Sequence, residues 1–357
     1  MITLIAFLIV LGILIFFHEL GHFLVAKANK VGVLKFSLGF GPAIFKKRIG
    51  ETEYMVSAIP LGGYVKMLGE SESEEEITHI DPERSFAKKR LISKTSIVAA
   101  GPIANLVLAF AIYCIIAWTG LPVIQPIIGE VQDGSPAYNA GFLAGDKIIS
   151  IDETRIDSWE SISPLIQNAG ENKTIDITIE RGSETFIIHV KPKMAKETNI
   201  FGEEISRPVI GISASGDMKI GRLGPVSGIR YGFSQTYKVI KITCIAFWKI
   251  LDGTIDIKKS IGGPIMIAQI SGQTFKAGLL PFFSMIAFIS INLGLINLMP
   301  IPILDGGHLL LFAIEGITRK PIEGRPREIA QQIGIFLLAL LMVFAVYNDI
   351  IRIISNR

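Results

Sequence analysis

Four long apolar stretches constrain the fold of this chain more than any other feature. Each is close to the roughly 20 residues that a helix needs to cross a bilayer, and they lie near residues 2–26, 96–119, 279–303 and 329–347. Half of the 357 residues are hydrophobic, which is far from the composition of an ordinary soluble protein. We therefore predict a polytopic α-helical membrane protein with about four transmembrane helices.

The first stretch resembles a signal peptide only in its position. It lacks a basic segment at its start, it is longer than a typical signal core, and no cleavage site is obvious. It also contains His18 and Glu19. We therefore expect it to remain in the mature protein as the first membrane span.

Basic residues gather at the ends of these stretches and predict their orientation. One group follows the first stretch and leads into the second, and another lies between the third and fourth: Lys27, Lys30, Lys35, Lys46, Lys47, Arg48, Arg84, Lys88, Lys89, Arg90, Lys94, Arg319, Lys320, Arg325 and Arg327. Short basic loops remain in the cytoplasm. Both termini and the segment 121–278 are then expected outside it. The net charge of +3 is too small to indicate a nucleic-acid partner.

Composition divides the chain into four parts. Residues 31–69 alternate loosely between apolar and polar and are rich in glycine, which predicts short strands joined by glycine turns. Residues 123–192 have the pattern of a soluble α+β domain, and the acidic run Glu70 to Glu76 is typical of a solvated loop. The predicted domains are 1–120 with two spans and the strand region, 121–215 as a globular domain, 216–278 as a linker, and 279–357 with two spans.

The linker has apolar and basic residues at near-helical spacing over 220–260. This pattern is typical of amphipathic helices at a membrane surface. A linker helix packed on the globular domain fits the same pattern, so both interpretations stay open. The two cysteines, Cys114 and Cys244, provide neither a disulfide framework nor a cysteine zinc site.

Within the first span, residues 18–22 read His-Glu-Leu-Gly-His. On a helix, His18 and His22 project from one face, where two neutral imidazoles can bind one zinc ion. Glu19 is the natural general base, because a glutamate beside the first ligand can take a proton from water. Ionisable groups in a span are costly and normally mark function, which favours this interpretation over a structural or accidental one.

A catalytic zinc ion usually has a third protein ligand. The best candidate is Asp305, which follows the third apolar stretch in a segment rich in proline and glycine that can break the helix. His308 is the rival ligand, and its alternative role is a hydrogen bond to a ligand. His79 and His189 receive no role, because surface histidine is the default in their surroundings.

These residues resemble the site-2 protease family of intramembrane zinc metalloproteases, and within it the bacterial RseP-like branch. The motifs that carry the resemblance are 18–22, 297–306, the segment Gly101 to Asn105, and the glycine-rich 39–42 and 60–67. The resemblance implies one zinc ion held by His18, His22 and Asp305, Glu19 as base, and Asn297 as a substrate-binding residue. Residues 39–42 and 60–67 resemble the membrane-associated β-hairpin region of that branch. For Asn105 itself, a packing role and an active-site role stay open.

The segment 121–215 resembles a PDZ domain through residues 134–137, 140–142 and 145–152. Only one such domain is found, whereas some relatives carry two. It is expected outside the cytoplasm, where it either binds a peptide end or limits access sterically.

The function implied by the resemblance is cleavage inside the transmembrane segments of single-span membrane proteins in a bacterial inner membrane. Anti-sigma factors and remnant signal peptides are the substrates expected of the family. Two rival functions are a metal transporter, for which the histidine motif has no repeat, and an inactive scaffold, which would lack Glu19 or a ligand.

Overall fold

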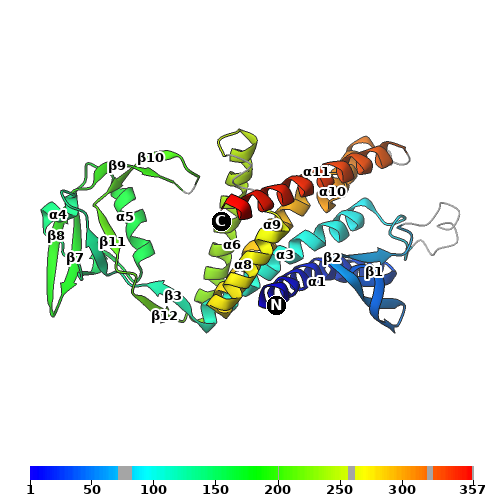
Figure 1. Ribbon diagram of the computed structural model, residues 1–357, viewed down its shortest axis with the longest axis horizontal. Helices are drawn as coiled ribbons and strands as arrows, with labels where there is room; N and C mark the ends of the chain where they lie inside the picture. Colours follow the sequence, from blue (N-terminus) through cyan, green and yellow to red (C-terminus); the bar gives the residue numbers. More distant parts are fainter. Residues whose placement is uncertain (71–82, 200, 256–261, 320–324, 356–357) are drawn as a thin grey trace. The chain divides into compact units, whose positions relative to one another are not determined.

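The computed structural model describes residues 1–357 except 71–82, 200, 256–261, 320–324 and 356–357. The chain forms two compact units (Figure 1). One contains Met1–Ile115 together with Ile229–Arg357, and the other contains Ile116–Gly228. Apart from Glu70, the acidic run predicted as a solvated loop lies outside the described residues, as does His79.

Four helices in the described chain are long and apolar enough to cross a membrane, as predicted. They are α1 (Ile2–Ala28), α3 (Leu91–Thr119), α9 (Leu279–Leu298) and the part Gln331–Ser355 of α11 (Arg325–Ser355). The third ends earlier than its apolar stretch, because the chain reaches two prolines after Leu298 and leaves the helix. Helix α10 (Asp305–Thr318) begins directly after this break.

Small residues let the helices around α1 approach closely. A Cβ atom at Gly21 of α1 would overlap the backbone carbonyl of Ala100 in α3, and one at Gly294 of α9 would lie 2.9 Å from the carbonyl oxygen of Pro102. Helix α9 is thus in backbone contact with α3, which is itself in backbone contact with α1. Such contacts suit spans in lipid, where packing rather than water exclusion drives association.

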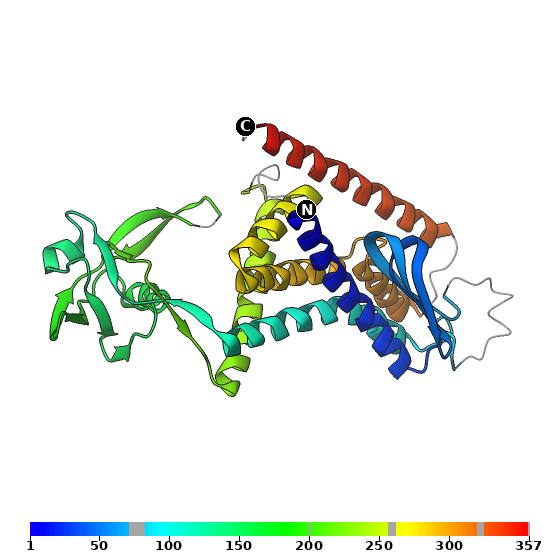
Figure 2. The ribbon, with the colours of Figure 1, turned by 60° about the horizontal axis from the view of Figure 1, so that its bottom comes forward.

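Residues 33–67 form the strands β1 (Val33–Ile49) and β2 (Thr52–Met67), which lie beside the carboxyl-terminal half of α1 (Figure 2). Phe36 pairs with both Tyr54 and Val65, so segment 33–38 lies between segments 52–57 and 63–67. Gly39, Gly41, Gly50 and Gly62, which all have positive φ, separate the segments. The structure therefore has strands and positive-φ glycines here, as predicted, but β1 and β2 are long and irregularly paired, at 17 and 16 residues, rather than short.

The order of these segments leaves one of them at an edge. Segment 43–49 pairs with 52–57, and 52–57 also borders 33–38. Segment 63–67 pairs with 33–38 on one side and has no second partner strand among the described residues. Apart from the Met67 amide, which donates to the Glu70 side chain, the backbone groups on its other side could pair with another strand.

Most of the described part of the predicted linker 216–278 is helical, but its first residues form strand β12 (Met218–Gly221), which pairs with β3 (Leu121–Ile124). Helix α6 (Pro225–Leu251) carries exposed aromatic side chains at Phe233, Tyr237 and Trp248, and α8 (Pro264–Ala277) packs against α1, α9 and α11. The buried Asp349 of α11 accepts hydrogen bonds from three backbone amides at the start of α8, those of Gly263, Ile265 and Met266. A carboxylate at a helix amino terminus is electrostatically favourable, so this contact ties α11 to α8.

The unit Ile116–Gly228 is built around the four-stranded sheet β6-β5-β7-β8. Its elements are β3 (Leu121–Ile124), β4 (Ile128–Val131), α4 (Pro136–Ala140), β5 (Lys147–Ile151), β6 (Thr154–Arg155), α5 (Ile162–Ala169), β7 (Ile175–Arg181), β8 (Glu184–Val190), β9 (Lys193–Thr198), β10 (Glu204–Val209), β11 (Ile212–Ala214) and β12 (Met218–Gly221). Isoleucines from the strands and from α5 form most of the core. The strands and helix predicted over 123–192 are present.

Local signals in the sequence account for α4. Ser135 caps the helix by accepting a hydrogen bond from the Tyr138 amide, at 3.2 Å, and Pro136 occupies its first turn. Gly141 ends it with φ of 89°, in the left-handed region that favours glycine. These residues belong to the motif that carries the PDZ resemblance.

An ion pair joins Arg181 and Asp146 at the edge of this core. Asp146 is buried and accepts two hydrogen bonds from Arg181, at 2.7 and 2.8 Å, which raise the pKa of the guanidinium. Arg181→Ala would leave this carboxylate buried without its cation. We expect a loss of about 3 kcal/mol in the stability of this unit, measured by thermal denaturation and limited proteolysis of the whole protein.

The matched control is Arg155→Ala, because Arg155 pairs with Asp157 at 3.3 Å while both side chains are more than four-fifths exposed. This variant should change stability by less than about 1 kcal/mol. Equal stability of the two variants would contradict the importance of the buried pair.

Candidate active site

Helix α1 carries three of the predicted site residues. His18 and His22 are one helical turn apart and point to the same side, and Glu19 and His22 are each only 8% exposed. The surrounding helix is strongly apolar, so these polar groups are not a solvated surface. Their presence inside a candidate membrane span has a cost that only interactions at the site can offset.

Asp305 reaches the two histidines because of the break after α9. The chain turns through residues 299–304, and Asp305 is then the first residue of α10. A Cβ atom at Gly306 would overlap the carbonyl oxygens of Leu298 and Met299, so the tight turn requires glycine there. The proline and glycine residues of this segment thus position the carboxylate.

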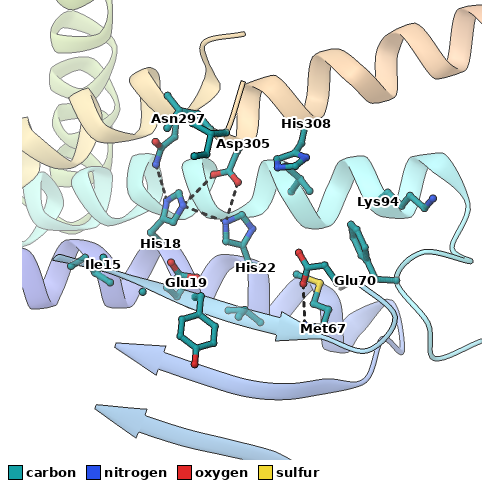
Figure 3. A pocket seen from close by; sticks show the side chains of 18 of the residues that line it. Ile15, His18, Glu19, His22, Met67, Glu70, Lys94, Asn297, Asp305 and His308 are labelled. Carbon is teal, nitrogen blue, oxygen red and sulfur yellow. Dashed lines mark hydrogen bonds and ion pairs between the residues drawn. The ribbon is translucent and has the colours of Figure 1, made fainter. Parts of the chain in front are cut away.

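Donor atoms of three side chains converge between these elements (Figure 3). His18 Nε2 lies 3.2 Å from Asp305 Oδ2 and 3.3 Å from His22 Nε2, and His22 Nε2 lies 3.5 Å from Asp305 Oδ1. Tetrahedral zinc with bonds of about 2.0–2.1 Å separates its ligand atoms by about 3.3 Å. The two imidazoles and the carboxylate therefore fit one zinc ion. Within the described chain, they form the one such group of histidine, cysteine and acidic side chains.

The other ring nitrogen of each histidine also has a neighbour. His22 Nδ1 lies 2.9 Å from the backbone carbonyl oxygen of Ile97 in α3, to which it donates when Nε2 binds a metal. His18 Nδ1 lies near two side-chain amides, at 3.2 Å from Asn105 Nδ2 and 3.5 Å from Asn297 Nδ2. The predicted residue Asn297 is therefore next to His18 at the end of α9.

Glu19 lies on the side of the site that faces the strands. A Cβ atom at Gly63 would be 2.8 Å from Glu19 Cγ and 2.9 Å from Ile15 Cγ2, so the edge segment 63–67 passes directly over this part of α1. Figure 3 shows Glu19 between the strand and the histidines. Glu19 lines the same cavity as His18, His22 and Asp305.

The site opens into a cavity of about 560 Å³. Its lining combines α1 residues, the edge segment of β2, the end of α9 and the start of α10. His308 lies in this wall but outside the group of three donors. Glu70 also lines the cavity, and its side chain accepts a hydrogen bond from the Met67 amide. The sequence does not predict this position, because the acidic run to which Glu70 belongs is typical of a solvated loop.

Comparison with known proteins identifies the class to which this site belongs. The family model described as Peptidase family M50 matches residues 6–341. The chain belongs to peptidase family M50. The resemblance to the site-2 protease family is thereby confirmed, and this M50 peptidase is a zinc metalloprotease.

Relatives of the M50 peptidase match it over almost their whole length, and the names of the following three describe a zinc metalloprotease. The relative from Agrobacterium fabrum is 33% identical, with 98% of this chain and 96% of the relative covered. The one from Clostridium acetobutylicum is 35% identical, with 95% of each covered. The one from Campylobacter jejuni is 34% identical, with 98% and 94% covered.

Among solved structures, the PDZ domain of the SdrC-like protein from Listeria monocytogenes matches one segment of the M50 peptidase. The two are 22% identical, the match covers 26% of this chain and 90% of that one, and the TM-score is 0.21. The PDZ assignment of 121–215 stays a prediction.

The M50 site makes one position in α3 intolerant of any side chain. A Cβ atom at Gly101 would overlap the His22 imidazole at Nε2. We expect Gly101→Ala to displace this ring and to lower the zinc content of the purified protein at least about tenfold, measured by metal analysis.

Gly12→Ala in α1 is the control, because a Cβ atom there meets nothing within 4 Å. Alanine also favours a helix by about 0.5–1 kcal/mol, so this variant should keep its zinc. Full zinc content in Gly101→Ala would contradict the expected displacement of the His22 ring from the metal.

Proposed function

We propose that the chain is an intramembrane endopeptidase that hydrolyses peptide bonds in the transmembrane segments of other proteins. The observation that supports this most strongly is the location of the group His18, His22 and Asp305 with Glu19. Two of the three donors and the carboxylate base belong to a helix that is long and apolar enough to span a membrane. A hydrolytic site at that depth is suited to substrates that are themselves in the bilayer.

His18, His22 and Asp305 would hold the zinc ion, which when bound supplies Lewis acidity that activates water and polarises a peptide carbonyl. Glu19 would accept a proton from the attacking water. The same carboxyl group would then deliver this proton to the amine that leaves when the C–N bond breaks. No covalent enzyme intermediate is required, since water is the nucleophile.

A transmembrane substrate must unwind before it can be cut, because a helix keeps its peptide groups in internal hydrogen bonds. The edge segment 63–67 supports a route for this step. Gly63, Tyr64 and Val65 line the cavity, and on one side their segment pairs with no other strand of the described chain. We propose that the unwound substrate adds to this edge as a further strand.

Asn297 would hold the substrate at the opposite side of the cavity, where its amide can pair with the backbone groups freed by unwinding. Its place at the end of α9, lining the same cavity as Glu19, supports this role.

We propose a multi-pass location in a bacterial inner membrane, with the strand region on the cytoplasmic side and residues 121–215 outside the cytoplasm. The basic loops described above support this orientation. The expected partners are single-span membrane proteins, such as anti-sigma factors or remnant signal peptides, and a peptide that binds 121–215. The domain limits 1–120, 121–215, 216–278 and 279–357 belong to the same proposal.

The test is cleavage of a tagged single-span protein by the purified enzyme in reconstituted vesicles. We expect cleavage to stop when a chelator removes the zinc and to return when zinc is added back. Cleavage that persists after complete metal removal would contradict the proposal. Zinc movement across the vesicles, with several single-span proteins left intact, would favour a transporter instead.

A further inference from the structure

Asn105 is a buried polar side chain beside His18 that has no role in the reaction proposed above. It lies within α3, in a helix of strongly apolar character, and its side chain is completely buried. Burying an amide in such surroundings is unfavourable unless both of its polar atoms find partners. Among the described residues, however, Asn105 Oδ1 has no hydrogen-bond partner.

The packing of α9 holds Asn105 firmly against His18. Ser290, itself completely buried, donates a hydrogen bond of 2.7 Å to the backbone carbonyl of Asn105. A Cβ atom at Gly294, one turn further along, would lie 3.5 Å from Asn105 Cβ. These contacts position the Asn105 backbone and Cβ, and the amide Nδ2 lies 3.2 Å from His18 Nδ1.

The chemistry of imidazole decides which amide atom can face His18 when a metal is bound. His18 Nε2 points at Asp305 and His22, so this nitrogen is the metal ligand and must carry no proton. In a neutral imidazole the proton is then on Nδ1, which becomes a donor. Nδ1 therefore needs an acceptor, and an amide NH₂ group cannot provide one.

Two amides lie near this nitrogen, and both have their Nδ2 atoms closer to it in the present arrangement. A half-turn of the Asn105 amide exchanges its two terminal atoms and leaves the rest of the side chain in place. Oδ1 would then accept the Nδ1–H hydrogen bond at about the present separation and would gain the partner that it lacks. Asn297, at 3.5 Å, would remain available for substrate.

We infer that Asn105 is a positioning residue, whose side-chain oxygen accepts the Nδ1–H bond of His18 and thereby orients Nε2 toward zinc. This inference rests on His18 being a zinc ligand, as proposed above. Acceptors behind a ligating histidine fix its tautomer and ring orientation, and their loss typically weakens metal binding by 10–100-fold. Asn105 would thus contribute to metal affinity without contacting metal or substrate.

The experiment is a chelator competition that measures zinc affinity in the purified full-length protein, with cobalt(II) absorption as a second readout. Asn105→Leu has nearly the same size and lacks an acceptor, whereas Asn105→Asp has the same size and keeps one. We expect about a 10–100-fold loss of zinc affinity in Asn105→Leu. Asn105→Asp should bind zinc within about threefold of the wild type or more tightly, with an unchanged cobalt spectrum.

Asn297→Leu is the comparison at the second amide, and it should keep wild-type zinc affinity. The inference is overturned if Asn105→Leu binds zinc as the wild type does, if Asn105→Asp loses as much affinity as Asn105→Leu, or if Asn297→Leu alone weakens binding. Should Asn105→Leu fail to fold, Asn105→Asp decides: retained affinity supports the inference, and a tenfold loss overturns it. A wild-type protein that binds no zinc would instead contradict the proposed ligands themselves.

Discussion

Glu19→Gln is expected to lower the rate of substrate cleavage by about 10²–10⁴-fold, the range that general acid–base catalysis contributes. Glutamine has nearly the same shape as glutamate but cannot take up and return a proton. Glu19 is not one of the three converging donors, so the variant should fold and bind zinc as the wild type does. Cleavage in vesicles and zinc content, measured on the same preparation, check both parts of this prediction.

Glu70→Gln provides the matched comparison, because Glu70 lines the same cavity and glutamine can still accept the hydrogen bond from the Met67 amide. We expect this variant to retain cleavage within about fivefold of the wild type, since it removes no proton-transfer group from the proposed reaction. A large loss in Glu70→Gln with near-normal cleavage in Glu19→Gln would show that Glu70, and not Glu19, is the general base.

Asp305→Ala should have the other large effect, the loss of both zinc and activity. Removing a zinc ligand is more severe than removing a residue that only hydrogen-bonds to a ligand. We therefore expect zinc affinity to fall by more than about 100-fold. The removal of Asp305 also leaves His18 and His22 without the carboxylate that contacts both. Metal analysis after gel filtration and cleavage in vesicles measure these losses.

His308→Ala separates the two ligand candidates that the sequence left open. His308 lines the cavity but does not belong to the group of donors that converge on one point. This variant should therefore keep its zinc. Loss of zinc from His308→Ala, with zinc retained in Asp305→Ala, would show that His308 is the third zinc ligand in place of Asp305.

The parts of the structure that the sequence predicted depend on local patterns. The spacing of His18 and His22 puts two imidazoles on one face of a helix wherever that helix packs. Long apolar stretches similarly indicate four spans, and the prolines after Leu298 indicate where the third one ends. The glycines between residues 39 and 62 likewise indicate the turns between strand segments, because glycine adopts positive φ readily.

Other features depend on contacts between distant segments, which one sequence does not reveal. Gly101 reads as a small residue at a helix contact, yet its lack of a side chain makes room for His22. The edge segment beside Glu19 is known only once the strand order is known. Asn105 is near His18 because α3 and α1 pack together, although 87 positions separate the two residues.

We propose that cleavage occurs inside a membrane span of the substrate, and identification of the bond that is cut tests this proposal. A single-span protein with defined isotopic labels would be incubated with the reconstituted enzyme, and the products analysed by mass spectrometry. We expect new termini within the apolar segment, present with wild type and absent with Glu19→Gln. Termini only in the soluble flanks of the substrate would contradict the proposal.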